Sequence, residues 1–147
     1  METGVGPTPA TGARTSIYVD EFGHTNPIPA ATRIGNLVYA SSMHGKDPAT
    51  GEVAATLEEQ CRWMFAHMRT VIEAAGGRTE DIIKVTIWMA DRSQREAVNR
   101  EWLQMFPDPA SRPARHSLQS QLDGGQLVVC DFVAVLGTVP GPEGEEL

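Results

Sequence analysis

Arg115 is the residue whose chemistry and place in the chain best suit substrate binding. It begins a predicted strand just after Pro113, a residue that favours an extended backbone. Its guanidinium stays charged and presents a planar fork of N–H donors, which suits a substrate carboxylate. An ordinary structural ion pair with an aspartate or glutamate is the alternative interpretation. The residue type alone leaves both interpretations open.

Other polar side chains lie at the ends of predicted strands and loops, and they form a candidate site with Arg115. Strand alternation places Ser117 on the same face as Arg115 and His116 on the opposite face. His44 lies in a loop directly after Ser41-Ser42, and an ordinary imidazole pKa of ~6.5 suits acid–base chemistry. A solvated loop histidine is the alternative for His44. The cluster consists of Asn26, Pro27, Ser41, Ser42, Asn99, Arg112, Arg115 and Ser117.

Standard cofactor and metal motifs do not occur in the sequence. It contains no GxGxxG, P-loop, HExxH or GxSxG pattern, and its four histidines show no metal-ligand spacing. Cys61 and Cys130 lie far apart and outside any CxxC pattern, so we expect free thiols in a reducing cytoplasm. Cys130 lies in a predicted strand near the candidate site, where a reactive thiol and a buried, unreactive one are both conceivable.

The composition excludes several classes of protein. A chain of 147 residues with 41% hydrophobic residues supports one packed domain, which we place at 15–137. We expect a flexible leader over 1–14 and a disordered acidic tail over 138–147. The net charge of −7 argues against nonspecific binding to nucleic acid or anionic membranes. We find no apolar stretch of ~18 residues and no secretory signal pattern, so we expect a cytoplasmic protein.

The spacing of apolar residues predicts two helices and five or six strands. The first helix, 56–75, has a capping-box pair in Thr56 and Glu59, and the second, 93–106, has one in Ser93 and Glu96. An Asp123-Gly124-Gly125 turn joins the last two strands. The three tryptophans are expected to serve packing or interfaces rather than a cofactor. The predicted strands are 16–19, 31–34, 37–42, 81–89, 115–119 and 127–136, and 43–51 is a predicted loop.

This order of elements predicts an α+β fold, with both helices on one face of a mixed sheet. A chain this short has no third layer for the other face of the sheet. Self-association is the simplest way to cover that face, so we expect a homo-oligomer.

Several short runs, in this order and spacing, resemble the RidA/YjgF family of reactive-intermediate deaminases, formerly called L-PSP endoribonucleases. The similarity covers about Pro27 to Ala134, which is most of the predicted domain. The runs are Arg33-Ile34-Gly35-Asn36-Leu37-Val38-Tyr39-Ala40-Ser41, Asp47-Pro48-Ala49-Thr50-Gly51-Glu52-Val53, Ile72-Glu73-Ala74-Ala75-Gly76-Gly77, Ile83-Lys84-Val85-Thr86, Ala97-Val98-Asn99 and Pro113-Ala114-Arg115.

The resemblance implies a chorismate-mutase-like fold assembled as a homotrimer, with active sites between subunits. The implied reaction is hydrolysis of enamines and imines, such as 2-aminoacrylate, to a keto acid and ammonia, without metal or organic cofactor. Arg115 matches the family arginine that holds the substrate carboxylate, and Asn99 matches an active-site asparagine. Ser41 and Ser42 match a Ser-Gly pair that lines the cleft. Ser117 matches a position whose backbone contacts substrate or water.

Two positions depart from the family pattern. Ile28 occupies the position of a family tyrosine, and Val129 occupies that of the glutamate that commonly holds the attacking water. A shift of one residue would place Cys130 there instead. Carboxylate binding is therefore expected to be kept and water activation to be altered. Water positioning would then fall to Ser41, Asn99 or His44.

Three functions remain open on the sequence alone. The first is an imine or enamine hydrolase that acts on a small carboxylate. The second is a non-hydrolytic relative that binds a small carboxylate metabolite or catalyses a specialised pathway step. The third is a ribonuclease or translation inhibitor, which the net charge of −7 and the lack of an aromatic–basic platform disfavour.

Overall fold

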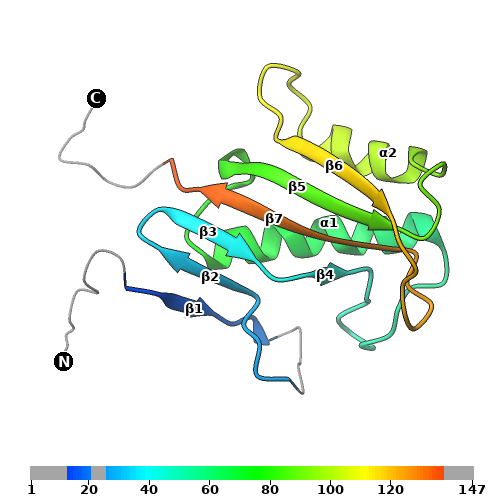
Figure 1. The fold of residues 1–147 in the computed structure, drawn as a ribbon, viewed down its shortest axis with the longest axis horizontal. Coiled ribbons are helices and arrows are strands. Elements are labelled where there is room, and N and C mark those ends of the chain that lie inside the picture. The colour runs from blue at the N-terminus through cyan, green and yellow to red at the C-terminus, as the bar shows by residue number, and fades with distance from the viewer. Residues whose placement is uncertain (1–12, 21–25, 138–147) are drawn as a thin grey trace.

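A mixed β-sheet with two helices across one face forms the protein, as Figure 1 shows for the computed structural model. The structure describes residues 13–20 and 26–137. The order of strands is β1-β2-β3-β7-β5-β6, and the short β4 also pairs with β7. The strands are β1 (Thr15–Ile17), β2 (Ala31–Ile34), β3 (Leu37–Ala40), β4 (Met43–His44), β5 (Ile82–Met89), β6 (Ala114–Gln119) and β7 (Val128–Val135); the helices are α1 (Leu57–Ala74) and α2 (Glu96–Met105). The expected α+β class is confirmed.

Helix α1 begins and ends where the sequence indicates. The Thr56 side chain accepts a hydrogen bond from the Glu59 backbone N–H at 3.2 Å, which satisfies one of the unpaired donors of the first turn. After the helix, Gly76 has a φ of 93°, a conformation that favours glycine. The apolar face of α1 packs on the sheet, with Met64 and Met68 fully buried.

Helix α2 begins later than predicted. Its first residue is Glu96, and its N-cap Arg95 makes no side-chain capping bond. The expected cap Ser93 instead donates from Oγ to the Asp91 carboxylate at 2.7 Å. The capping box of Ser93 and Glu96 was therefore wrong, because Asp91 holds Ser93 in a turn before the helix.

Residues 43 and 44 were expected in a loop, but they form β4. Met43 pairs with Cys130 and His44 pairs with Val129 on β7. The predicted turn at 123–125 is present, with positive φ at both glycines. The strands that it connects, β6 and β7, are not neighbours, because β5 lies between them.

The helices cover one face of the sheet and leave the other face exposed in the single chain. Alternate residues of β7 are buried, and these lie on the face that the helices cover. The other face, here called the open face, carries large apolar side chains at the β2–β3 hairpin. Leu37 is 42% exposed and Tyr39 is 55% exposed in the single chain. This is the uncovered face that the sequence predicts.

Most of the predicted leader and all of the predicted tail lie outside the described residues. Ala13 and Arg14, the described end of the leader, are exposed and belong to no strand or helix. In the described part of the chain, no helix is long and apolar enough to span a membrane. Over the same ranges, no group of three or more acidic, histidine or cysteine side chains is arranged to hold a metal ion.

Candidate functional site

Arg115 lies on the edge strand β6, on the face that the helices cover. It pairs with Val85 on β5, which is fully buried, and Val85 in turn pairs with the buried Phe132 on β7. The guanidinium therefore points toward α2. Its Nη2 donates to Oδ1 of Asn99 on that helix at 2.8 Å.

An aromatic ring supports the Arg115 guanidinium from one side. The Arg115 Cζ atom lies 4.9 Å from the centre of the Trp102 ring, a cation–π distance. Asn99 and Trp102 are three residues apart, so both project from the same side of α2. Phe106 packs edge-on against Trp102 at 4.8 Å between ring centres, which holds the indole in place.

The guanidinium borders a hollow of about 350 Å³, lined by Asn99, Trp102, Leu103 and Arg115. Burial, and then the charge of Arg95, lower the pKa of Arg115 from its usual value. Among the described residues no carboxylate forms an ion pair with Arg115. The alternative of a structural ion pair is therefore absent from the described part of the chain. A charged, partly desolvated guanidinium beside the apolar side chains of Trp102 and Leu103 is well suited to bind a small carboxylate with an apolar substituent.

Ser117 lies on the same face as Arg115, as predicted. Its partner on β5 is the buried Ile87, whereas His116 pairs with Thr86 on the open face. His116 therefore lies outside the Arg115 hollow, as the strand alternation indicated. The Ser117 carbonyl accepts a long hydrogen bond of 3.5 Å from Arg92.

The remaining candidates lie on the other side of β7. Ser41 follows β3 and donates from Oγ to the Pro29 carbonyl at 2.7 Å, which ties it to the loop that holds Ile28. Ser42 is exposed, and Ile28 is 43% exposed. This loop and the β3–β4 junction form a second group of candidates.

His44 and Val129 face each other across β4 and β7. Val129 also pairs with Trp88, which pairs with Leu118. These four side chains form one row on the open face. His44 Nδ1 is hydrogen-bonded to Oε1 of Gln126, a residue of the β6–β7 loop. His44 is therefore half-buried and hydrogen-bonded, and the alternative of a solvated loop histidine is wrong.

Cys130 does not reach the open face. It is fully buried beneath the helices, beside Ile87 and Met43, and burial strongly raises the pKa of its thiol. Its expected place among the substrate-binding residues was wrong, because its side chain alternates to the opposite face from Val129. Asp131 does share the open face, where burial raises its pKa and Lys84 partly offsets the change.

The candidates thus divide into two groups within one chain. Arg115, Asn99 and Ser117 meet at the β6 edge under α2. Ser41, Ser42, Ile28, His44 and Val129 belong to the β3–β4 end and the open face.

Sequence reasoning missed two residues that contact the candidate site. Trp102 was expected only to pack, and the signal that would identify it is its helical spacing from Asn99. Gln126 gave no signal, because its contact with His44 depends on the path of the loop after β6.

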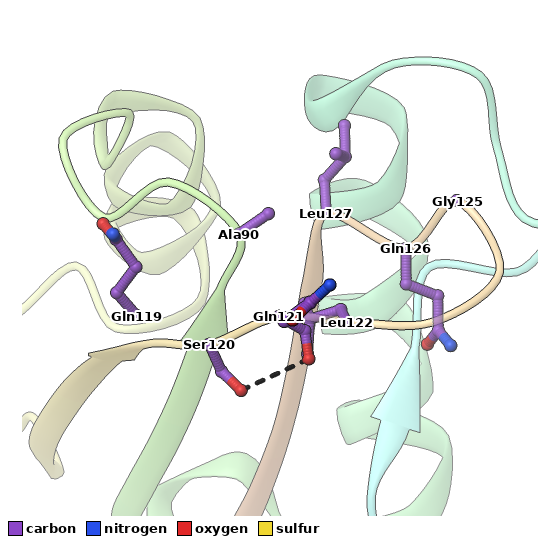
Figure 2. Close-up of a pocket in the computed structure, with 8 residues that line it drawn as sticks. All are labelled: Ala90, Gln119, Ser120, Gln121, Leu122, Gly125, Gln126 and Leu127. Carbon is purple, nitrogen blue, oxygen red and sulfur yellow. Dashed lines mark hydrogen bonds between the residues drawn. The ribbon is translucent and has the colours of Figure 1, made fainter.

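A second hollow, of about 640 Å³, lies at the end of the sheet near Gln126. Figure 2 shows Gln119 and Gln126 at opposite ends of its lining, with Ser120 and Gln121 between them. Leu127, which immediately precedes β7, also lines it. This hollow adjoins the strand end that carries Val129 and His44.

Comparisons with known proteins agree with the fold described above. The family model described as Endoribonuclease L-PSP matches residues 20–135. A RutC family protein from Haemophilus influenzae is 36% identical over 92 residues, 58% of this chain and 71% of that protein. The chloroplastic Reactive Intermediate Deaminase A of Arabidopsis thaliana is 32% identical over 94 residues, 63% of this chain and 49% of that protein. The crystal structure of RidA from an Antarctic Psychrobacter superposes with a TM-score of 0.76 at 27% identity, and covers 83% of this chain and 99% of that one.

Proposed function

Because the chain belongs to the Endoribonuclease L-PSP family, also known as RidA/YjgF, we propose that it is an enamine and imine deaminase. Its substrates are small carboxylate-bearing intermediates of the 2-aminoacrylate type, and its products are ammonia and a keto acid. One observation carries the proposal: the Arg115 guanidinium borders a small hollow. It is hydrogen-bonded to the Asn99 amide and stacked on the Trp102 indole, and no carboxylate of the described residues pairs with it. The names of relatives such as the Arabidopsis deaminase support it.

Arg115 binds the substrate carboxylate in this proposal. Asn99 accepts one N–H of the guanidinium at 2.8 Å, and Trp102 stacks on it, so the fork is oriented before substrate arrives. A pre-oriented guanidinium loses little side-chain entropy when it binds, and charge-assisted hydrogen bonds are about twice as strong as neutral ones. Fixing the carboxylate also fixes the imine carbon for attack.

The chemistry requires little more than a positioned water and a proton acceptor. An enamine that gains a proton on carbon becomes an iminium ion, which is already electrophilic. Water adds to the iminium carbon, the C=N pair moves to nitrogen, and His44 accepts the proton that the water loses. That proton returns to the amine nitrogen. The hydroxyl oxygen then forms the C=O bond as the C–N bond breaks and ammonia leaves. His44 accepts the hydroxyl proton and returns it to solvent, which is also the source of the proton that the enamine carbon gained.

We further propose that the protein is a homotrimer whose sites lie between subunits. The two groups of candidate residues lie on opposite faces of one sheet, so a second copy is needed to bring His44 and Val129 against Arg115. The exposed Leu37 and Tyr39 on the open face provide the apolar surface for such contact.

A second candidate function is a non-deaminating relative that binds a small carboxylate metabolite or catalyses another step. Two observations favour it. Val129 and Ile28 are aliphatic, and neither accepts a proton or holds a water by hydrogen bonds.

The two functions are distinguished by ammonia release. Imino acids are generated in place by an amino-acid oxidase from a panel of parent amino acids, with and without the protein. The deaminase predicts faster ammonia release, with a preference for parents that carry small apolar side chains. The binding alternative predicts ammonia release at the uncatalysed rate together with saturable binding of a keto acid.

A further inference from the structure

We infer that Leu103 is a specificity-determining residue, whose side chain packs against the side chain of the substrate and selects imino acids with an aliphatic substituent such as that of leucine. This inference rests on the proposed function and deepens it. It names the part of the substrate, beyond the carboxylate, that this chain recognises and the residue that recognises it.

Leu103 lies on the same side of α2 as the two residues that contact Arg115. It follows Asn99 by four residues, which places the two side chains on neighbouring turns of one helix face, and it comes directly after Trp102. All three line the hollow of about 350 Å³ together with Arg115. The described lining therefore offers a ligand one guanidinium, one amide and two apolar side chains.

The two apolar side chains differ in the surface that they leave for a ligand. Trp102 is 8% exposed, because the Arg115 guanidinium lies over its ring and Phe106 packs edge-on against it. Leu103 is 52% exposed. Most of the apolar surface that a ligand can newly cover in this hollow therefore belongs to Leu103, and removing that surface from water favours binding.

The anchored carboxylate directs the rest of the substrate toward this surface. Asn99 Oδ1 already accepts from Nη2 of Arg115, and the Trp102 ring covers one face of the guanidinium. A carboxylate that enters the hollow binds the N–H groups that remain. The atoms attached to it then meet the lining, where Leu103 is the exposed apolar side chain.

Arg95 is the group that would favour a different substrate side chain. It precedes Asn99 by four residues, it is exposed, and its charge contributes to the lowered pKa of Arg115. A substrate with a second carboxylate would turn that group toward Arg95. Leu103 lines the hollow, whereas Arg95 is outside its described lining. The geometry therefore favours an aliphatic side chain over an acidic one.

Three variants of Leu103 separate apolar contact from size. Leu103→Ala shortens the side chain, Leu103→Asn keeps a similar size but is polar, and Leu103→Met keeps an apolar side chain of similar volume. Gln104→Ala is the matched control, because Gln104 is the next residue of α2, is exposed and is outside the described lining. The side chains of both positions are exposed, so the four variants are expected to fold.

The readout is the ratio of kcat/KM for the imino acid of leucine to that for the imino acid of alanine, with the imino acid of glutamate as a third substrate. We expect the wild type to prefer the leucine-derived substrate. The ratio should fall by roughly 10-fold in Leu103→Ala and Leu103→Asn, the lower end of the range for one methylene in an apolar pocket, because Leu103 is only half covered. Leu103→Met and Gln104→Ala should keep the wild-type ratio.

Two results overturn the role of Leu103. One is an unchanged ratio in Leu103→Ala and Leu103→Asn, including the case in which sedimentation velocity shows a smaller particle, since Leu103 would then serve contact between subunits. The other is a wild-type preference for the glutamate-derived substrate, which would direct the side chain toward Arg95.

Binding measurements separate this inference from the proposed function. If the wild type releases no ammonia above the uncatalysed rate, the deaminase proposal fails. Calorimetry with pyruvate and 4-methyl-2-oxopentanoate, the keto acids of alanine and leucine, then tests Leu103 by itself. Tighter binding of the longer keto acid in the wild type, lost in Leu103→Ala, supports its role, and the same ratio of affinities in both proteins overturns it.

Discussion

Arg115 and Val129 belong to the same sheet but point to opposite faces. Arg115 pairs with the buried Val85 under the helices, whereas Val129 pairs with Trp88 and His44 on the open face. Their strands, β6 and β7, are separated by β5, which is a distance of about 10 Å between backbones. A small substrate held by Arg115 therefore does not reach Val129 or His44 of the same chain across a closed sheet. The proposed reaction requires a second copy.

Disruption of the open face should abolish activity together with self-association. Leu37→Asp places a charge on the exposed apolar surface of β3, where burial in an interface would be costly. We expect a smaller particle by sedimentation velocity and loss of ammonia release, with far-UV circular dichroism unchanged. Ala66→Asp, on the exposed side of α1, is the control and should leave both properties unaltered. An active monomer in the Leu37→Asp variant would contradict the shared site.

A charge at position 99 should compete with the substrate. In Asn99→Asp, a carboxylate replaces the amide oxygen that lies 2.8 Å from Arg115 Nη2, so it pairs with the guanidinium. The substrate carboxylate then has to displace an existing partner. We expect KM to rise by about 10-fold or more, because a charged hydrogen bond contributes about 1.5–3 kcal/mol. The effect on kcat should be smaller. Steady-state kinetics check this, and an unaltered KM would show that Arg115 does not bind the substrate.

The two cysteines should be inert in the folded protein. Burial, and then the charges of Glu101 and Glu58, raise the pKa of Cys61 from 9.0 to about 12, and burial likewise raises that of Cys130. We expect no reaction with a thiol reagent at neutral pH, and reaction of both cysteines after unfolding. Fast labelling of the native protein would show that one thiol is accessible.

The raised pKa of the Cys61 thiol also implies that the free energy of unfolding declines at high pH. A raised pKa means that the unfolded chain loses the thiol proton at a lower pH than the folded protein does. The contribution of Cys61 to the free energy of unfolding is therefore complete below pH 9.0 and is lost as the pH rises toward about 12. Denaturant titrations of the wild type and of Cys61→Ala over this range check the sign, since the variant should lose less stability.

The helices and the main strands are predictable because their signals are local. Thr56 and the apolar stripe of α1 occupy neighbouring turns, and Gly76 ends the helix by its own backbone preference. The choice of Arg115 as a candidate site residue is also possible from the sequence, because its residue type and its position after Pro113 are both local. Its partner Asn99 was placed in the same polar cluster from the residues alone, but its active-site assignment came from the resemblance, and Trp102 was not expected in the site.

The elements that were missed depend on contacts between distant segments. His44 becomes part of a strand only because Val129 pairs with it, and neither segment carries a signal for the other. The face of Cys130 depends on where β7 begins, and a shift of one residue reverses it. Gln126 contacts His44 because Gln60 on α1 holds the loop between β6 and β7.

The most direct test of the central claim compares kcat/KM for ammonia release from imino acids in four proteins: the wild type, Arg115→Ala, Arg115→Lys and Arg69→Ala. Arg69 is an exposed arginine of α1, so its variant controls for loss of one positive charge. We predict a loss of about 100-fold or more in Arg115→Ala, a partial loss in Arg115→Lys because the planar fork is gone, and no change in Arg69→Ala. Wild-type turnover that is undiminished in folded Arg115→Ala would contradict the account.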